Sequence, residues 1–166
     1  VRTELRLLAR AGVFCGLATI GAGSVSQVAQ ASMRMPPVVA HAELLLRSSE
    51  YGKVIFDGGG KVLYLFGADH GPKSACYGIC ASAWPPLLTK GAPHVGMGLD
   101  AKLLGTTMRK DGSMQVTYNG HPLYTYSADM SGKIMCQHVK MHGGLWYVVK
   151  ANGTPDMEKN KTGMGM

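Results

Sequence analysis

The sequence lacks the short motifs that mark common enzyme and nucleotide sites. It contains no G-x-S-x-G, no H-E-x-x-H and no P-loop, the patterns that supply an esterase nucleophile, a zinc-protease centre and a phosphate cradle. The three consecutive glycines at 58–60 stand between two β-rich runs and not before a helix, so they favour a hairpin turn. The residues identify no reaction, and we favour a protein that is not an enzyme.

Charged residues are few, at 16% of the chain, whereas hydrophobic residues make up 46%. This balance is typical of a globular chain rather than a disordered one. The lysines behind the net charge of +7 are scattered, with no basic cluster and no nucleic-acid-binding motif. They are best interpreted as a solvated basic surface, and we expect no nucleic-acid partner.

The N-terminal apolar run is too short for a membrane-spanning helix. It extends from Ala11 to about Ala22, against the ~20 residues that cross a bilayer. Three arginines precede it and the small-x-small site Ala29-Gln30-Ala31 follows it, which is the pattern of a secretory signal peptide over residues 1–31. Its removal takes away three arginines and one glutamate, so the net charge falls from +7 to +5. We expect a secreted or periplasmic protein with no transmembrane span; bulky Phe14 before Cys15 argues against a lipid-anchor site.

One stretch of the sequence occurs twice. Tyr64-Leu65-Phe66-Gly67-Ala68-Asp69 returns sixty residues later as Tyr124-Thr125-Tyr126-Ser127-Ala128-Asp129. A leucine precedes each copy, a cysteine stands seven residues after each Asp, and a tryptophan follows. The cysteines are Cys76 and Cys136, and the tryptophans are Trp84 and Trp146. A repeat of this kind indicates two tandem structural units.

β-rich runs and turn signals predict an all-β fold. Residues 53–56 and 62–66 flank the glycine-dense turn, and residues 115–118 and 122–126 flank Asn119-Gly120, the strongest two-residue hairpin signal. Further strands are expected over 105–108 and 145–150, whereas residues 42–48 fit either a strand or a short helix.

We therefore predict a compact sandwich or barrel of about seven or eight short strands, built from two repeated hairpin units. This two-repeat β domain is expected over residues 42–151, with helix confined to a turn or two near 74–83 and 100–104. Residues 32–41 are expected to form an extended leader, and residues 152–166 a disordered tail.

The repeated aromatic and acidic residues fit a structural role. In each copy two rings share one face of a strand, Tyr64 with Phe66 and Tyr124 with Tyr126. Asp69 and Asp129 follow these strands, where a carboxylate accepts hydrogen bonds from turn N–H groups or from a tyrosine hydroxyl. Trp84, stiffened by the two prolines that follow it, is expected to be a buried anchor. The alternative is a pair of carboxylates that perform acid–base chemistry in a cleft.

Three cysteines remain after removal of the signal peptide, and exported proteins normally pair them. A bridge between Cys76 and Cys80 is favoured, because a separation of four residues around Gly78 is compatible with disulfide geometry. A bridge from Cys136 to either of them is the alternative, since Cys136 stands at the position of Cys76 in the second unit. In both cases one thiol is left over.

A metal site is a third interpretation of Cys136. Cys136, His138 and His142, the Cys136 cluster, lie with two methionines within eight residues, and such soft and borderline ligands suit copper or zinc. Against this, the C-x-H-x₃-H spacing matches no structural zinc pattern, and methionine more often fills gaps in a core. We assume no cofactor, with copper or zinc as the alternative.

Several of these features occur together in one known family. They are the repeated Tyr-x-aromatic-x-x-Asp pattern, Cys76-Tyr-Gly-Ile-Cys80-Ala, Trp84-Pro85-Pro86, Arg109-Lys-Asp-Gly-Ser113, Gln115-Val116-Thr117-Tyr118-Asn119-Gly120 and Pro122-Leu123-Tyr124. Over residues 52–149 this combination resembles the bacterial secreted repeats of unknown function, also described as predicted lipoproteins with a YxFxxD-type motif. The resemblance implies an exported bacterial protein of two repeats without an established activity. The chain departs from the family in lacking a lipobox and in carrying the Cys136 cluster.

The sequence thus predicts an exported cell-envelope protein with a binding or structural role, whose partner is an envelope component or a small ligand. The alternative is metal binding by the Cys136 cluster, or thiol redox chemistry of the Cys76/Cys80 pair. An enzyme that uses Asp69 and Asp129 comes third.

Overall fold

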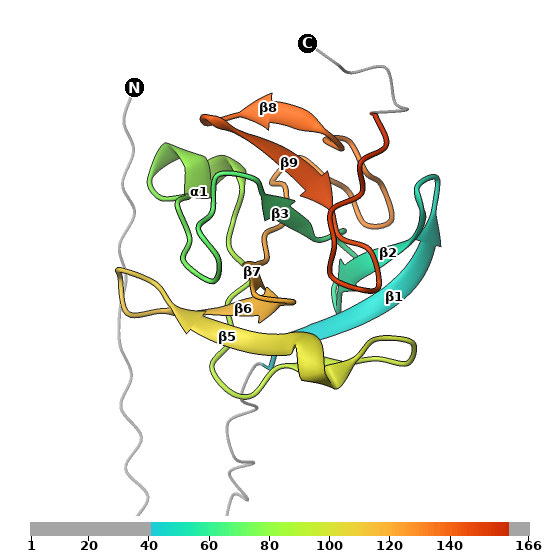
Figure 1. Cartoon of the computed structure of the whole chain (residues 1–166), viewed down its shortest axis with the longest axis horizontal. Helices are drawn as coiled ribbons and strands as arrows, with labels where there is room; N and C mark the ends of the chain where they lie inside the picture. Colours follow the sequence, from blue (N-terminus) through green and yellow to red (C-terminus); the bar gives the residue numbers. More distant parts are fainter. Residues whose placement is uncertain (1–40, 160–166) are drawn as a thin grey trace, which may run out of the picture. The chain divides into compact units, whose positions relative to one another are not determined.

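The computed structural model describes residues 41–159; the predicted signal peptide, residues 32–40 of the predicted leader and residues 160–166 lie outside them. Within the described range the fold is all-β with little helix, as predicted. Nine short strands accompany one helical turn, α1 (Ile79–Ala83), and one 3-10 turn, η1 (Ala101–Leu103). The strands form three small sheets rather than one closed sheet (Figure 1). Neither helical segment of this part of the chain has the length and hydrophobicity to cross a membrane.

The first sheet has the strand order β2-β1-β4. β1 (Glu43–Ser49) pairs antiparallel with β2 (Gly52–Asp57), and the short β4 (His94–Val95) joins the start of β1 in parallel. The segment whose periodicity fitted strand or helix is therefore a strand, because β2 follows it directly and supplies a complete antiparallel partner.

The second sheet contains β5 (Leu104–Met108), β6 (Met114–Tyr118) and β7 (His121–Pro122). The predicted hairpin at Asn119-Gly120 is present: both residues have positive φ, 50° and 75°, as a two-residue type I′ turn requires. The strand expected over residues 105–108 is present as β5, and it forms an antiparallel hairpin with β6.

The third sheet has the order β3-β9-β8, with β3 (Tyr64–Phe66), β9 (Gly144–Val148) and β8 (Val139–Met141). β8 was not predicted, because three residues give too little periodicity and the turn after it begins with His142, which is not a usual turn residue. The predicted hairpin of residues 53–56 with 62–66 is reduced to one bridge between Phe56 and Val62. β2 pairs along its length with β1, and β3 pairs with β9 rather than with β2.

Each repeat pairs its tryptophan segment with the aromatic strand of the other repeat. Gly67 N–H, at the end of β3, donates to Leu145 O on β9 over 2.7 Å. Ser127 N–H, at the equivalent position of the second repeat, donates to Ala83 O over 2.9 Å. The two repeats therefore exchange their closing segments, and neither completes its own sheet.

The exchanged segments differ in regularity because of Pro85 and Pro86. In the second repeat the closing segment is the regular strand β9, paired with β3 from Tyr64↔Val148 to Phe66↔Trp146. In the first repeat the two prolines have no N–H to donate, so the ladder is interrupted. Only isolated bridges remain, among them Pro86↔Tyr124.

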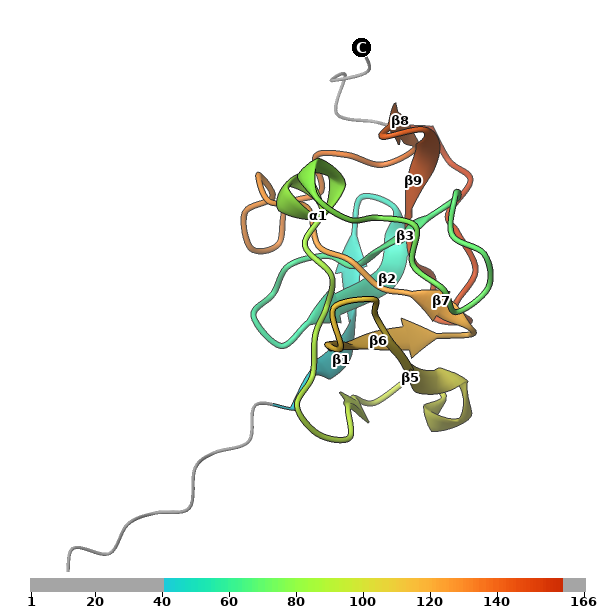
Figure 2. The same ribbon diagram turned by 90° about the vertical axis from the view of Figure 1, so that its left-hand side faces the viewer.

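The strand segment 62–66 lies at the centre and is apolar on both faces. Leu63 and Leu65 join a largely aliphatic core with residues of β1, β2 and β6. Tyr64 and Phe66 join an aromatic core on the other face, with residues of α1 and β9 nearby. Figure 2 shows β3 between the β8–β9 hairpin and the β5–β6 hairpin, which lie on opposite sides of it.

The described part of the predicted tail is folded against the domain. Asp156 is only 1% exposed, and its N–H donates to Val148 O. The buried Gln137 side chain donates to Asp156 O and Glu158 O, both over 2.8 Å. The folded domain thus extends beyond residue 151, where the sequence predicted it to end. Hydrogen bonds to backbone groups hold this segment, and such bonds leave no hydrophobic pattern in the sequence.

A substitution at Gly144 tests how closely the second repeat packs against the first. A Cβ at this position would lie 2.5 Å from Phe66 Cε2 and 3.1 Å from Ala68 N, and its φ is not in the left-handed region. We expect Gly144→Ala to lower the free energy of unfolding by about 1–3 kcal/mol, as overpacking does. Gly58→Ala is the matched control, because its Cβ would meet nothing closer than 3.4 Å. Urea unfolding measures both, and equal effects of the two substitutions would contradict the close packing.

Candidate functional site

The two repeats meet at a pair of backbone hydrogen bonds between equivalent tyrosines. Tyr64 N–H donates to Tyr124 O over 2.8 Å, and Tyr124 N–H donates to Tyr64 O over 2.9 Å. The two segments run antiparallel at this bridge. Interchanging the two repeats turns each of these bonds into the other. An approximate twofold axis therefore passes between the two tyrosines.

The tyrosine hydroxyls cross to the aspartates of the opposite repeats. Tyr64 Oη donates to Asp129 Oδ2 over 2.6 Å, and Tyr124 Oη donates to Asp69 Oδ2 over 2.9 Å. A hydroxyl bonded to a carboxylate is among the stronger hydrogen bonds in proteins. These two bonds, the crossed Tyr–Asp pairs, make each repeat depend on the other for a polar partner.

The second oxygen of each carboxylate holds the turn that follows it. Asp69 Oδ1 accepts from Ala75 N over 2.7 Å, and Asp129 Oδ1 accepts from Met135 N over 3.1 Å. Each donor lies six residues after its aspartate and directly before the repeat's cysteine. Both oxygens of each carboxylate therefore have partners inside the fold.

Burial shifts the titration of the crossed pairs. It raises the pKa of Asp69 from 3.8 to about 6, although the Ala75 N–H and the Tyr124 hydroxyl act in the opposite direction. Burial also raises the pKa of Asp129. The pKa values of Tyr64 and Tyr124 are raised, first by burial and then by the neighbouring carboxylates. Both hydroxyls thus keep their protons and act as donors.

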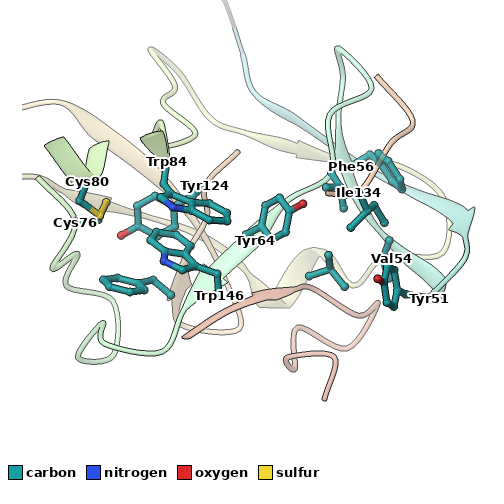
Figure 3. Packing of buried hydrophobic residues seen from close by; sticks show 13 residues of the cluster. Tyr51, Val54, Phe56, Tyr64, Cys76, Cys80, Trp84, Tyr124, Ile134 and Trp146 are labelled. Atoms are coloured by element: carbon teal, nitrogen blue, oxygen red, sulfur yellow. A yellow bond between two sulfur atoms is a disulfide. The ribbon is translucent and has the colours of Figure 1, made fainter. Parts of the chain in front are cut away.

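Four aromatic rings form a continuous stack beside the tyrosine pair. Trp84 and Trp146 lie face to face, with centroids 3.9 Å apart and planes 6° from parallel (Figure 3). Phe66 is stacked on Trp146 at 4.2 Å, and Tyr126 covers Trp84 at 4.6 Å with its plane tilted by 37°. Each outer ring comes from the opposite repeat to the tryptophan that it covers.

The tyrosines of the crossed pairs close the stack from its edges. Tyr64 meets Trp84 edge-on at 5.0 Å, and Tyr124 meets Trp146 edge-on at 5.2 Å. Both edge-on contacts have the T-shaped geometry that aromatic quadrupoles favour. All eight repeated residues singled out in the sequence therefore lie in one site, which we call the inter-repeat cluster: Tyr64, Phe66, Asp69, Trp84, Tyr124, Tyr126, Asp129 and Trp146.

The first repeat closes with the predicted disulfide. Cys76 and Cys80 are bonded, with their Cα atoms 5.3 Å apart, and the bridge borders the aromatic core (Figure 3). Cys136 is free and half-buried, and burial raises the pKa of its thiol. The position four residues after Cys136 is Lys140 on β8, so the second repeat has no partner equivalent to Cys80.

The Cys136 cluster does not converge on one point. The extended strand β8 separates its two histidines, and four residues of strand span about 13 Å. His138 lies beside the ring of Tyr147 at 5.2 Å, whereas His142 is exposed in the turn before Gly143. Over residues 41–159, no three His, Cys, Asp or Glu side chains come together as metal ligands do.

Sequence reasoning missed a buried cation next to the Tyr124–Asp69 pair. Arg109 is only 5% exposed and donates to Gln115 Oε1 over 2.5 Å, to Ser74 Oγ over 3.0 Å and to Cys76 O over 2.7 Å. Ser74 Oγ also lies 2.8 Å from Tyr124 Oη, whose single proton is donated to Asp69. Arg109 thereby joins the β5–β6 hairpin to the disulfide loop of the first repeat. The signal was Gln115, a polar residue among apolar strand neighbours.

A family model for secreted repeats of unknown function matches the chain twice, over residues 46–88 and 105–150. The chain belongs to this family. Each matched segment contains one complete set of the repeated tyrosine, aspartate and tryptophan. The inter-repeat cluster is thus the junction between two secreted-repeat units. Neither a curated protein nor a solved structure matches the chain.

The raised pKa of Asp69 predicts an unusual dependence of stability on pH. A carboxyl whose pKa is about 6 in the folded state and 3.8 ordinarily binds its proton more tightly when folded. Its contribution is therefore fully present below pH 3.8 and is lost as the pH rises through 6. Between pH 5 and 7.5 the full shift would raise the unfolding equilibrium constant of the wild type about tenfold relative to that of Asp69→Asn, and partial exposure of Asp69 reduces the expected rise to roughly threefold. Urea unfolding across this range gives the comparison; parallel profiles would contradict it.

Proposed function

We propose that this secreted-repeat protein is a non-enzymatic binding or structural module of the bacterial cell envelope. Its repeated residues hold two units together and present their surfaces as one rigid body. The observation that carries this proposal is the crossing of the Tyr–Asp pairs, because it uses both carboxylates for cohesion between the repeats.

The placement of the aspartates supports this role over catalysis. A general acid or base needs access to a substrate proton, within hydrogen-bond reach. Three surface hollows, with volumes of ≈ 550, 480 and 320 Å³, are lined by other parts of the chain. None of the three includes a residue of the inter-repeat cluster in its lining. The described hydrogen bonds and ion pairs contain no direct link between Asp69 and Asp129.

Metal or thiol chemistry is the second candidate, and the free Cys136 favours it. In an oxidising compartment an unpaired thiol is uncommon. This thiol is half-buried next to the hydroxyl of Tyr126, which lowers its pKa in part against the larger effect of burial. The two candidate functions can be distinguished by experiments on the exported protein, from which residues 1–31 have been removed.

A thiol and metal assay makes the distinction. For a structural module we expect one maleimide-reactive thiol, at Cys136, and an intact Cys76–Cys80 bridge in peptide mass spectra. We expect the rate of native labelling to be the same with and without added Zn²⁺ or Cu⁺. His138→Ala is the matched control and should label at the same rate. One equivalent of bound metal that blocks labelling, and is lost in His138→Ala, would instead establish the Cys136 cluster as a metal site.

A further inference from the structure

Two histidine rings touch at one corner of the first sheet, far along the chain from one another. The ring centroids of His41 and His94 lie 5.3 Å apart, with their planes at 61°. Two imidazoles that bind one zinc ion through Zn–N bonds of about 2.1 Å at a tetrahedral angle have their centroids roughly 5 Å apart. The separation of the two rings therefore fits a shared metal ion.

The ring of His41 is held with its second nitrogen available. Its Nδ1 lies 3.0 Å from Ala92 O, and a carbonyl oxygen only accepts, so Nδ1 carries a proton and donates it. In the neutral ring the lone pair is then on Nε2. Metal-bound histidines usually donate their other ring N–H in this way, because the bond fixes the tautomer and the orientation of the ring. Neither ring nitrogen of His94 makes a hydrogen bond within residues 41–159, so His94 is free to turn one toward the ion.

A carboxylate stands on the same face of the sheet as the two rings. At the start of β1 exposure alternates: His41 and Glu43 are exposed, whereas Ala42 and Leu44 are buried. This is the alternation of an extended chain, so His41 and Glu43 project from one face. β4 pairs parallel with β1 and places His94 opposite Glu43, on that same face. The Glu43 carboxylate has no hydrogen-bond or ion-pair partner in the described part of the chain.

The space beside this face is open and acidic. A hollow of ≈ 320 Å³ has His41, Glu43 and Asp57 in its lining, and its lining contains no lysine or arginine. The Glu43 carboxylate leans toward Gly58, where Oε2 would lie 3.4 Å from an added Cβ. The three ligand groups thus do not surround one point as they stand. Rotation of the exposed Glu43 side chain brings its carboxylate toward the rings and breaks no contact.

We infer that His41, Glu43 and His94 bind a borderline divalent cation, Zn²⁺ above all, with water as the fourth ligand. Imidazole nitrogen suits Zn²⁺, whereas Mg²⁺ and Ca²⁺ prefer sites built from oxygen alone. The ion ties β4 to the start of β1, two segments that share only a two-residue ladder. The site has no residue in common with the inter-repeat cluster or with the Cys136 cluster, and it is independent of the proposed function.

Zinc titration of the exported protein, without a polyhistidine tag, tests this site. Cys136→Ser serves as the background, so that the Cys136 cluster cannot contribute. We expect calorimetry to show one bound equivalent of Zn²⁺ and no binding of Mg²⁺. His41→Ala, His94→Ala and Glu43→Gln should each raise the Kd at least about tenfold, because each removes one ligand. His70→Ala removes an exposed histidine from another turn, and as the matched control it should leave the Kd unchanged.

Nuclear magnetic resonance of the ring nitrogens identifies the ligand atoms. In the zinc-loaded protein Nε2 of His41 should bind the metal while Nδ1 keeps its proton. Glu43→Gln leaves both rings in place, so its higher Kd tests the site even where a histidine substitution disturbs β4. No binding at ~1 mM Zn²⁺ would overturn the inference, as would a Kd unchanged in both histidine variants. An equal loss of affinity in His70→Ala would show adventitious binding and would also overturn it.

Discussion

The structure depends on the two hydrogen bonds that cross between the repeats, from Tyr64 to Asp129 and from Tyr124 to Asp69. A buried carboxylate is costly unless donors satisfy it. Here the hydroxyl that satisfies each aspartate belongs to the other repeat, while the turn N–H belongs to the same repeat. Separation of the repeats would leave both carboxylates short of a donor and would expose both indoles. The polar bonds therefore fix which segments pair, and burial of the aromatic rings adds a favourable hydrophobic contribution.

The same junction tolerates large differences between the repeats around it. The first repeat has a helical turn, a disulfide and two prolines after its tryptophan, whereas the second has the β8–β9 hairpin and a free cysteine. One consequence is visible in the tryptophans: Trp146 Nε1 donates to Met141 O on β8, but Trp84 Nε1 is buried without a partner in residues 41–159. The hairpin of the second repeat offers a carbonyl that α1 does not. What the repeats share is thus the cluster itself, and each repeat has its own means of holding the loop beside it.

The sequence was informative wherever local chemistry decides the outcome. Asn119-Gly120 predicted its hairpin because few other residues accept positive φ, and the spacing of Cys76 and Cys80 predicted the disulfide. The repeat predicted two units, but not that they exchange their closing segments, since pairing between distant strands leaves no local pattern. For the same reason the buried Arg109 was not identified, and the hairpin of residues 53–56 with 62–66 was overestimated. In the Cys136 cluster, closeness in sequence does not mean closeness in space, because an extended strand separates its two histidines.

A double-mutant cycle tests most directly whether the repeats are held by crossed pairs. Free energies of unfolding would be measured for Tyr64→Phe, Asp129→Asn and the double variant, with Tyr64→Phe and Asp69→Asn as the matched cycle within one repeat. The account predicts a coupling energy of about 1–3 kcal/mol between Tyr64 and Asp129, and additivity within about 0.5 kcal/mol for Tyr64 with Asp69. Coupling of Tyr64 to Asp69 in place of Asp129, or additivity in both cycles, would contradict it.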